Sequence, residues 1–312
     1  PRIFKAAEQE YSSQEVQLHH EIKSIYDLFQ VDYPSLASIS RSVENKRPPG
    51  YLQIPPIDDR FEDQYAIDVL DILNIIAGDS IHEYRQIGLE MQQDRNGSYG
   101  HRKMSLKPGL AIPLLIETIA HEHAHFLDFD GMSNLRAKLL HESRKASMAL
   151  VIHLDPNLGL WKMFEKYYKD RNYQSGSIGN PFIELGNDLE SMVQSGMLMH
   201  RKGSSVVNKL VSASNRVGQT NPLSDIVISA AEQKKSLPPE IRKIYSTHFH
   251  AMLRELNAET IGHVVAGKKS ELGQNAKLNQ LTLQMLKSRN PQLTSIEMIR
   301  GKLQQLQLLS MQ

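Results

Sequence analysis

The sequence of 312 residues contains no cysteine, and this absence excludes disulfide bonds and thiolate metal ligands. It also lacks an apolar run of the roughly 20 residues that a membrane-spanning helix needs, because Glu117 interrupts the most apolar stretch. The net charge is only +1, which gives the chain no general attraction for nucleic acid or for anionic membranes. We therefore expect no nucleic acid among its partners and no membrane span.

The sequence does contain enough apolar residues to form a folded core. Hydrophobic residues make up 40% of the chain and charged residues 23%, a balance typical of globular rather than disordered proteins. A chain of this length forms one large domain or two modest ones. Helical patterns dominate and one short region reads as extended, so we expect an α+β fold with a small mixed sheet and mostly helical additions.

The most informative feature is the run His-Glu-His-Ala-His at residues 121–125, which contains the pattern H-E-x-x-H. The four-residue spacing places His121 and His125 on one face of a helix, where both imidazoles can bind a single tetrahedral ion. Glu122 lies beside them and can take a proton from an attacking water. The alternative interpretation is a pair of surface histidines on an amphipathic helix.

The residues around the motif predict a helix that packs on a core. Pro113 suits a first helical turn, and Gly131 can end the helix one turn after the motif. At 100° per residue, one apolar stripe forms on this helix, made of Ile112, Ile116, Ile119, Ala120 and Leu127. The two outer histidines fall on the far side of the stripe. His123 falls in its middle, so we expect His123 to be a buried, neutral core residue and not a ligand.

A zinc ion needs at least one further protein ligand. A histidine six residues past His125 would serve, but that position is Gly131. Asp128 and Asp130 lie nearby and read more simply as residues of the helix end and the following turn. A later predicted helix, at about 181–199, carries Glu184 and Asp188 on one face.

These residues resemble the gluzincin metallopeptidases, which include thermolysin-like enzymes and anthrax lethal-factor-like toxins. The family has H-E-x-x-H on one helix and a glutamate ligand on a second, often as E-x-x-x-D or E-x-x-x-E. The resemblance implies that Zn²⁺ is held by His121, His125 and Glu184. It further implies that Asp188 orients a ligating histidine and that Glu122 is the general base. We expect on the same basis a zincin-like core.

Two further residues are candidates for stabilising the oxyanion of the transition state. Lethal-factor-like enzymes place a tyrosine seven residues before the ligand glutamate, and that position is Ser177 here. The nearest upstream tyrosine is Tyr173. Among the remaining histidines, His200 lies sixteen positions after Glu184 and is the first to test. Tyr173 and His200 therefore join the catalytic candidates.

The region before the motif fits the upper lobe of a zincin. The pattern predicts a helix from Asp63 to Ala77, a half-buried strand at 87–91, a turn at 94–97 and a second extended run from Tyr99 to Leu106. In the family the last strand before the active helix is an exposed edge that binds the substrate backbone by strand addition. The resemblance thus implies that a protein or peptide substrate lies along residues 99–106. An ordinary hairpin covering a core is the alternative.

The predicted organisation is a catalytic core at residues 1–200, with its upper lobe at about 60–131. A helical C-terminal part at 201–312 would pack on the lower lobe or complete it. Beyond the motif, helical patterns are found at residues 132–154, 160–168, 239–256 and 291–309.

The resulting hypothesis is a zinc-dependent endopeptidase that cleaves a protein substrate. The family analogy favours a bacterial toxin or effector acting on a host protein, secreted and delivered into the host cytosol; a cytoplasmic location is the alternative. Two other functions fit the same residues. One is a helical partner-binding protein with a structural or vestigial zinc site. The other is a zinc hydrolase of a small substrate.

Overall fold

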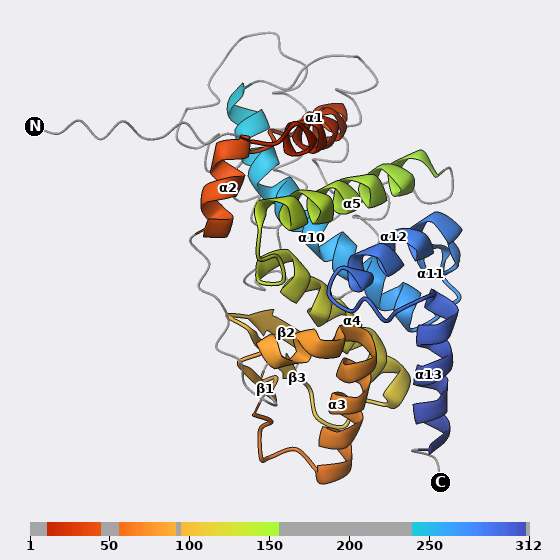
Figure 1. Ribbon diagram of the computed structural model, residues 1–312. Coiled ribbons are helices and arrows are strands. Elements are labelled where there is room, and N and C mark those ends of the chain that lie inside the picture. The colour runs from red at the N-terminus through yellow and green to blue at the C-terminus, as the bar shows by residue number, and fades with distance from the viewer. Residues whose placement is uncertain (1–10, 45–55, 92–94, 156–238, 310–312) are drawn as a thin grey trace, which may run out of the picture. The chain divides into compact units, whose positions relative to one another are not determined.

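The computed structural model describes residues 11–44, 56–91, 95–155 and 239–309. These residues are mostly helical and include a small three-stranded mixed sheet, which confirms the α+β class (Figure 1). No helix among them is both long enough and apolar enough to span a membrane. The described helices, in chain order, are α1 (Ser13–Leu28), α2 (Leu36–Glu44), α3 (Asp63–Ala77), the short 3-10 helix η1 (Gly78–Glu83), α4 (Ile112–Phe129), α5 (Leu135–Leu154), α10 (Pro239–Val265), α11 (Glu271–Gln274), α12 (Ala276–Lys287) and α13 (Ile296–Leu309).

The chain forms two compact units. The first comprises Pro1–Ile22, Pro34–Val151 and Asn257–Gln312, and the second comprises Lys23–Tyr33 and Ile152–Leu256. The H-E-x-x-H motif, the sheet and the C-terminal helices belong to the first unit. The domain boundary predicted near residue 200 lies outside the described residues.

The sheet contains strands β1 (Gln86–Leu89), β2 (Gly97–Gly100) and β3 (Lys103–Leu106) in the order β1-β3-β2. β3 pairs in parallel with β1 and antiparallel with β2. The central strand is therefore β3, and β2 is an edge.

This arrangement corrects the prediction of one edge strand from Tyr99 to Leu106. A two-residue turn interrupts that run, because His101 and Arg102 have positive φ angles of 50° and 61°. Such a turn matches the twist of a hairpin. His-Arg is not one of the Asn-Gly or Asp-Gly pairs that usually mark this turn, so the sequence pattern concealed it.

Helix α3 has the bounds that its sequence predicted. It ends at Gly78, whose φ of +53° is a conformation that favours glycine. The buried face carries Val69, Ile72, Leu73 and Ile76, and the helix contacts α4 and α13 (Figure 1). The periodicity of the apolar residues was sufficient to predict this helix, because one face of α3 is buried and the other is exposed to solvent.

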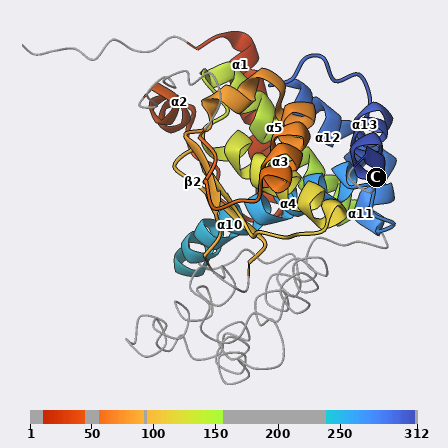
Figure 2. The ribbon, with the colours of Figure 1, turned by 90° about the horizontal axis from the view of Figure 1, so that it is seen from below.

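Helix α4 carries the motif and contacts α3, β2, β3 and α13 (Figure 2). Pro113 lies in its first turn, as expected. At the other end, the backbone N–H groups of Asp130 and Gly131 both donate to the carbonyl of Phe126, at 2.8 Å. Most of the predicted apolar stripe is buried, and Leu115 and Phe126 add to it. The helix is thus held on most of its circumference.

A buried cluster of charged side chains joins the end of α4 to α5. Oδ1 of Asp128 accepts from Nε2 of His141 at 2.8 Å and from Nζ of Lys145 at 2.9 Å. Lys145 also donates to Glu142 at 3.0 Å. Burial opposes ionisation of Asp128, but Lys145 and His141 hold its pKa well below the usual range. The cluster anchors the helix end three residues after the motif.

Helix α10 is longer than predicted. The pattern indicated a helix over residues 239–256, whereas the structure continues to Val265. The chain then turns through Gly267, which has a φ of +65°. The extra turns carry Glu259 and His263, two side chains that reach the motif helix.

We expect Asp128→Asn to lower the free energy of unfolding by about 3 kcal/mol, because it leaves Lys145 buried with only one carboxylate. Urea denaturation measures this. Asp71→Asn is the matched control: Asp71 is exposed on α3, and its substitution should change stability by no more than about 0.5 kcal/mol. Equal effects of the two variants would contradict the anchoring role of the cluster.

Candidate metal centre

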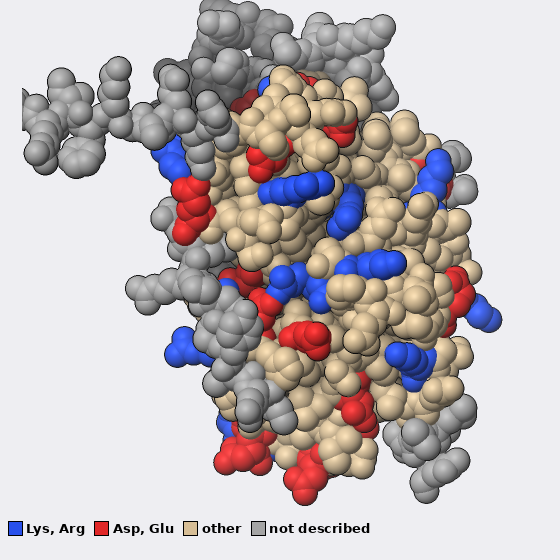
Figure 3. Space-filling model, viewed as in Figure 1, with Lys and Arg blue, Asp and Glu red and all other residues tan. Residues whose placement is uncertain are grey.

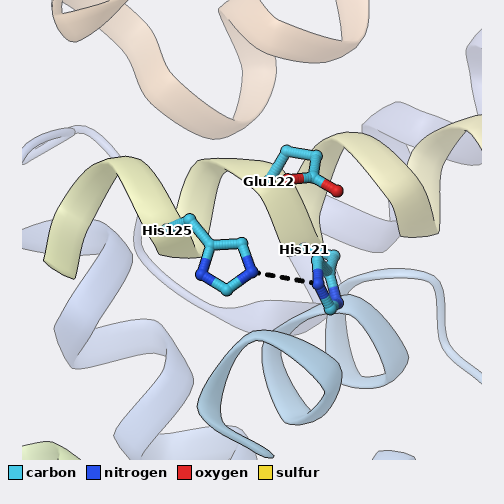
Figure 4. Close-up of side chains that lie close together, drawn as sticks. All are labelled: His121, Glu122 and His125. Atoms are coloured by element: carbon cyan, nitrogen blue, oxygen red, sulfur yellow. Dashed lines mark hydrogen bonds between the residues drawn. The ribbon is translucent and has the colours of Figure 1, made fainter. Parts of the chain in front are cut away.

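The imidazoles of His121 and His125 converge on the same side of α4. Their Nε2 atoms lie 3.2 Å apart (Figure 4). Two nitrogen ligands of a tetrahedral zinc ion, each at about 2.0–2.1 Å from it, lie roughly 3.3–3.4 Å apart. The observed separation therefore fits two ligands of one ion with little rearrangement.

A carboxylate from α10 lies at the other nitrogen of His121. Oε1 of Glu259 is 3.7 Å from Nδ1 of His121, and both side chains are largely buried. A carboxylate on this side favours the tautomer with the proton on Nδ1, which leaves the lone pair on Nε2 for a cation. The donor set and its surroundings thus fit a metal ion held by the two Nε2 atoms.

Glu122 is buried on α4 beside the histidines and lies against the edge strand. Its side chain is only 5% exposed. A Cβ atom added to Gly97 would lie 3.1 Å from Oε1 of Glu122 and 2.7 Å from Cγ2 of Thr118. The missing side chain at Gly97 lets β2 approach the motif helix at the carboxylate. A buried carboxylate is thereby placed next to a strand edge.

The free edge of β2 presents the backbone polar groups of two residues. The N–H of Lys107 donates to the carbonyl of Asn96 at 2.8 Å. In an antiparallel pair, every second residue of a strand bonds to its partner strand and the residues between them point outwards, so this bond fixes which residues of β2 bond to β3. In that alternation, the N–H and C=O groups of Gly97 and Tyr99 point away from β3. Within the described parts of the chain, no strand pairs with this edge. It can accept an extended peptide.

Tyr99 fixes the far end of β2 to α4. Its hydroxyl donates to Oδ2 of Asp130 at 2.6 Å, and its ring meets Tyr84 and Phe126 edge-on. Together with the close approach at Gly97, this contact holds the edge strand along the motif helix.

The histidine inside the motif is a core residue, as predicted. His123 is fully buried, and burial lowers its pKa to about 3, so the ring is neutral. The hydroxyl of Tyr84 donates to its Nδ1 at 2.7 Å. Burial, followed by the charges of Glu122 and Asp130, raises the pKa of Tyr84 well above its ordinary value, which keeps this donor protonated.

The other predicted site residues separate into two groups. Asp128 and Asp130 are engaged elsewhere, the first with α5 and the second with Tyr99, which agrees with their interpretation as helix-end residues. Glu184, Asp188, Tyr173 and His200 lie outside the described residues.

The sequence analysis does not predict Glu259 as a site residue, because the helical pattern ends at Leu256 and the helix continues to Val265. One feature of the sequence could have indicated it: Glu259 follows Glu255 with the E-x-x-x-E spacing. Within the described part of the chain, the structure brings Glu259 to the motif. The predicted 181–199 helix lies outside the described residues.

Charged side chains of both signs are interspersed on the face shown in Figure 3. This distribution agrees with the net charge of +1.

Comparison with known proteins found no matching family model, no similar curated protein and no similar solved structure. The geometry of the site therefore carries the functional argument.

We expect His123→Leu to leave zinc affinity unchanged, because Nδ1 of His123 is bonded to Tyr84 and not to the metal side of α4. The free energy of unfolding should fall by about 1–3 kcal/mol, since the Tyr84 hydroxyl loses its buried partner. Adding Tyr84→Phe should recover most of that loss. Zinc titration and urea denaturation measure the two effects. A large loss of zinc affinity in His123→Leu would contradict the assignment.

Proposed function

We propose that this chain is a zinc-dependent endopeptidase of the gluzincin type. One observation carries the proposal: two converging imidazoles, a buried carboxylate and the free edge of a strand meet on one side of a single helix. A structural metal site needs the imidazoles but needs neither the carboxylate nor the edge. The zincin-like architecture of the core is part of this proposal.

The metal ion would be held by Nε2 of His121 and Nε2 of His125, with a carboxylate as third ligand. When bound, zinc supplies Lewis-acid chemistry, polarising the scissile carbonyl and lowering the pKa of water towards about 7. Glu122 accepts the proton from the attacking water and passes it to the leaving amine. Its burial against β2 keeps the carboxylate in one place, beside the histidines and away from bulk water.

The substrate would bind as an added strand on β2. Gly97 and Tyr99 offer backbone donors and acceptors that a peptide in extended conformation can pair with. Gly97 is the residue nearest to Glu122, so a peptide bond paired near Gly97 lies closest to the base. This replaces the predicted binding along residues 99–106, since β3 is already paired on both sides.

Glu259 is proposed to orient one of the metal ligands. In the family, a second acid orients a ligating histidine. Glu259 faces Nδ1 of His121, which suits that role. By the resemblance, Glu184 remains the proposed third ligand.

The rival functions predict different behaviour. A partner-binding protein with a vestigial site has no use for Glu122, and a hydrolase of small molecules has no use for a free strand edge. We place the enzyme among bacterial effector proteases delivered into host cells, as the family analogy suggests.

Glu122→Gln should retain zinc and fold, because Glu122 is not a ligand in this proposal. Its rate of peptide cleavage should fall by about 10²–10⁴-fold, the usual cost of losing a positioned general base. Mass spectrometry of a proteome-derived peptide library incubated with the zinc-loaded protein measures the cleavage.

The control is Glu62→Gln, which removes an exposed carboxylate just before α3 and should cleave like the unaltered protein. Cleavage by Glu122→Gln at the same rate as this control would rule out the catalytic role. In that case the partner-binding function becomes the better account.

The ligand assignment is tested with two alanine variants and a zinc titration. We expect Glu184→Ala to abolish tight zinc binding and Glu259→Ala to weaken it by about 10–100-fold, as loss of an orienting partner does. If Glu184→Ala binds zinc as tightly as the unaltered protein, its assignment as the third ligand is wrong.

A further inference from the structure

Behind Glu259 lies a second group of polar side chains that the proposed reaction does not use. While Oε1 of Glu259 faces His121, its Oε2 lies 3.8 Å from Nε2 of His263, one turn later on α10. The same Nε2 lies 3.4 Å from Oε1 of Glu117, one turn before His121 on α4. His263 thus stands between two carboxylates, one from each helix.

The opposite side of the His263 ring is held by Ser270. The hydroxyl oxygen of Ser270 accepts from the backbone N–H of Gly273 at 3.1 Å, where it caps α11. Oγ of Ser270 also lies 2.9 Å from Nδ1 of His263. Two carboxylates face Nε2, and they favour the tautomer that carries the proton on Nε2, with Nδ1 accepting from the Ser270 hydroxyl.

Lys268 offsets the charge of Glu117. Its Nζ lies 2.6 Å from the carboxylate oxygens of Glu117. The carboxylate of Glu259 faces His121 with Oε1 and His263 with Oε2.

We propose that His263 is a positioning residue of the metal centre. Its Nε2 faces Glu117 at 3.4 Å and Glu259 at 3.8 Å, and this polar contact keeps the carboxylate of Glu259 turned towards Nδ1 of His121. The inference rests on the proposed metal site at His121 and His125. In this arrangement His263 orients the carboxylate of Glu259, and Glu259 in turn orients the proposed metal ligand His121.

The packing of the two helices supports this role. A Cβ added to Gly262 would lie 3.1 Å from the carbonyl oxygen of Glu117 and 3.6 Å from Cβ of His121. The absence of a side chain at Gly262 brings α10 close to α4 at the residue just before His263. That approach allows one imidazole to span both carboxylates.

Glu117, Glu259 and His263 are also close enough together to hold a second cation. Lys268 already places a positive charge on Glu117, and Ser270 turns the protonated nitrogen of His263 towards the carboxylates. A second metal ion would have to displace both. We therefore assign the group to positioning, and the protein should bind one equivalent of metal.

The test compares His263→Phe, which fills the space without an N–H, with His263→Gln, whose amide N–H can still donate to the carboxylates. Competition with a chromophoric chelator gives the zinc dissociation constant. We expect it to rise by about 10–100-fold in His263→Phe and to return close to the original value in His263→Gln. The Co²⁺-loaded proteins should show a changed visible spectrum only in His263→Phe. His153→Ala, which removes an exposed imidazole elsewhere, is the control.

Unchanged zinc affinity in His263→Phe overturns the inference, as does binding of two zinc equivalents by the unaltered protein. If His263→Phe does not fold, Ser270→Ala gives the same test, because it removes the group that fixes the ring tautomer; unchanged affinity there also overturns the inference. Failure of the unaltered protein to bind zinc is a separate outcome. It removes the proposed metal site itself, and the inference falls with it.

Discussion

The close approach of α10 to α4 at Gly262 is the contact on which the candidate site depends. With only a hydrogen in place of a side chain, the backbone of α10 lies against Glu117 and His121. Glu259, three residues earlier, then reaches Nδ1 of His121, and His263, one residue later, reaches Glu117. A methyl group at residue 262 would lie 3.1 Å from the carbonyl oxygen of Glu117, a contact tight enough that one of the helices would have to shift.

Helix α4 satisfies two opposing requirements at once. Its apolar face needs burial, and its polar face must hold imidazoles and a carboxylate in a fixed arrangement. Buried polar groups are costly unless they are hydrogen-bonded. Neighbouring elements supply hydrogen-bond partners, Tyr84 for His123 and α5 for Asp128, and α10 places the Glu259 carboxylate 3.7 Å from Nδ1 of His121. The contacts that stabilise α4 also fix the orientation of the side chains on it.

The spacing of residue types along the sequence predicted the features that depend on a single helix or strand. The bounds of α3, the burial of His123 and the shared face of His121 and His125 all follow from a helical period of 3.6 residues. What depends on two elements could not be predicted in this way. The pairing of β3 on both sides and the contact of Glu259 with His121 join segments distant in sequence. The continuation of α10 past Leu256, which carries Glu259, also lies beyond the helical pattern of the sequence.

The central claim is that α4 presents two histidines to one catalytic metal ion. X-ray absorption at the zinc edge of the zinc-loaded protein tests it most directly, because it reports the atoms bound to the ion. The account predicts one zinc with two imidazole nitrogens at about 2.0 Å and oxygen atoms in the remaining positions. A zinc ion with three or more imidazole ligands, or a protein that retains no zinc on dialysis, would contradict it.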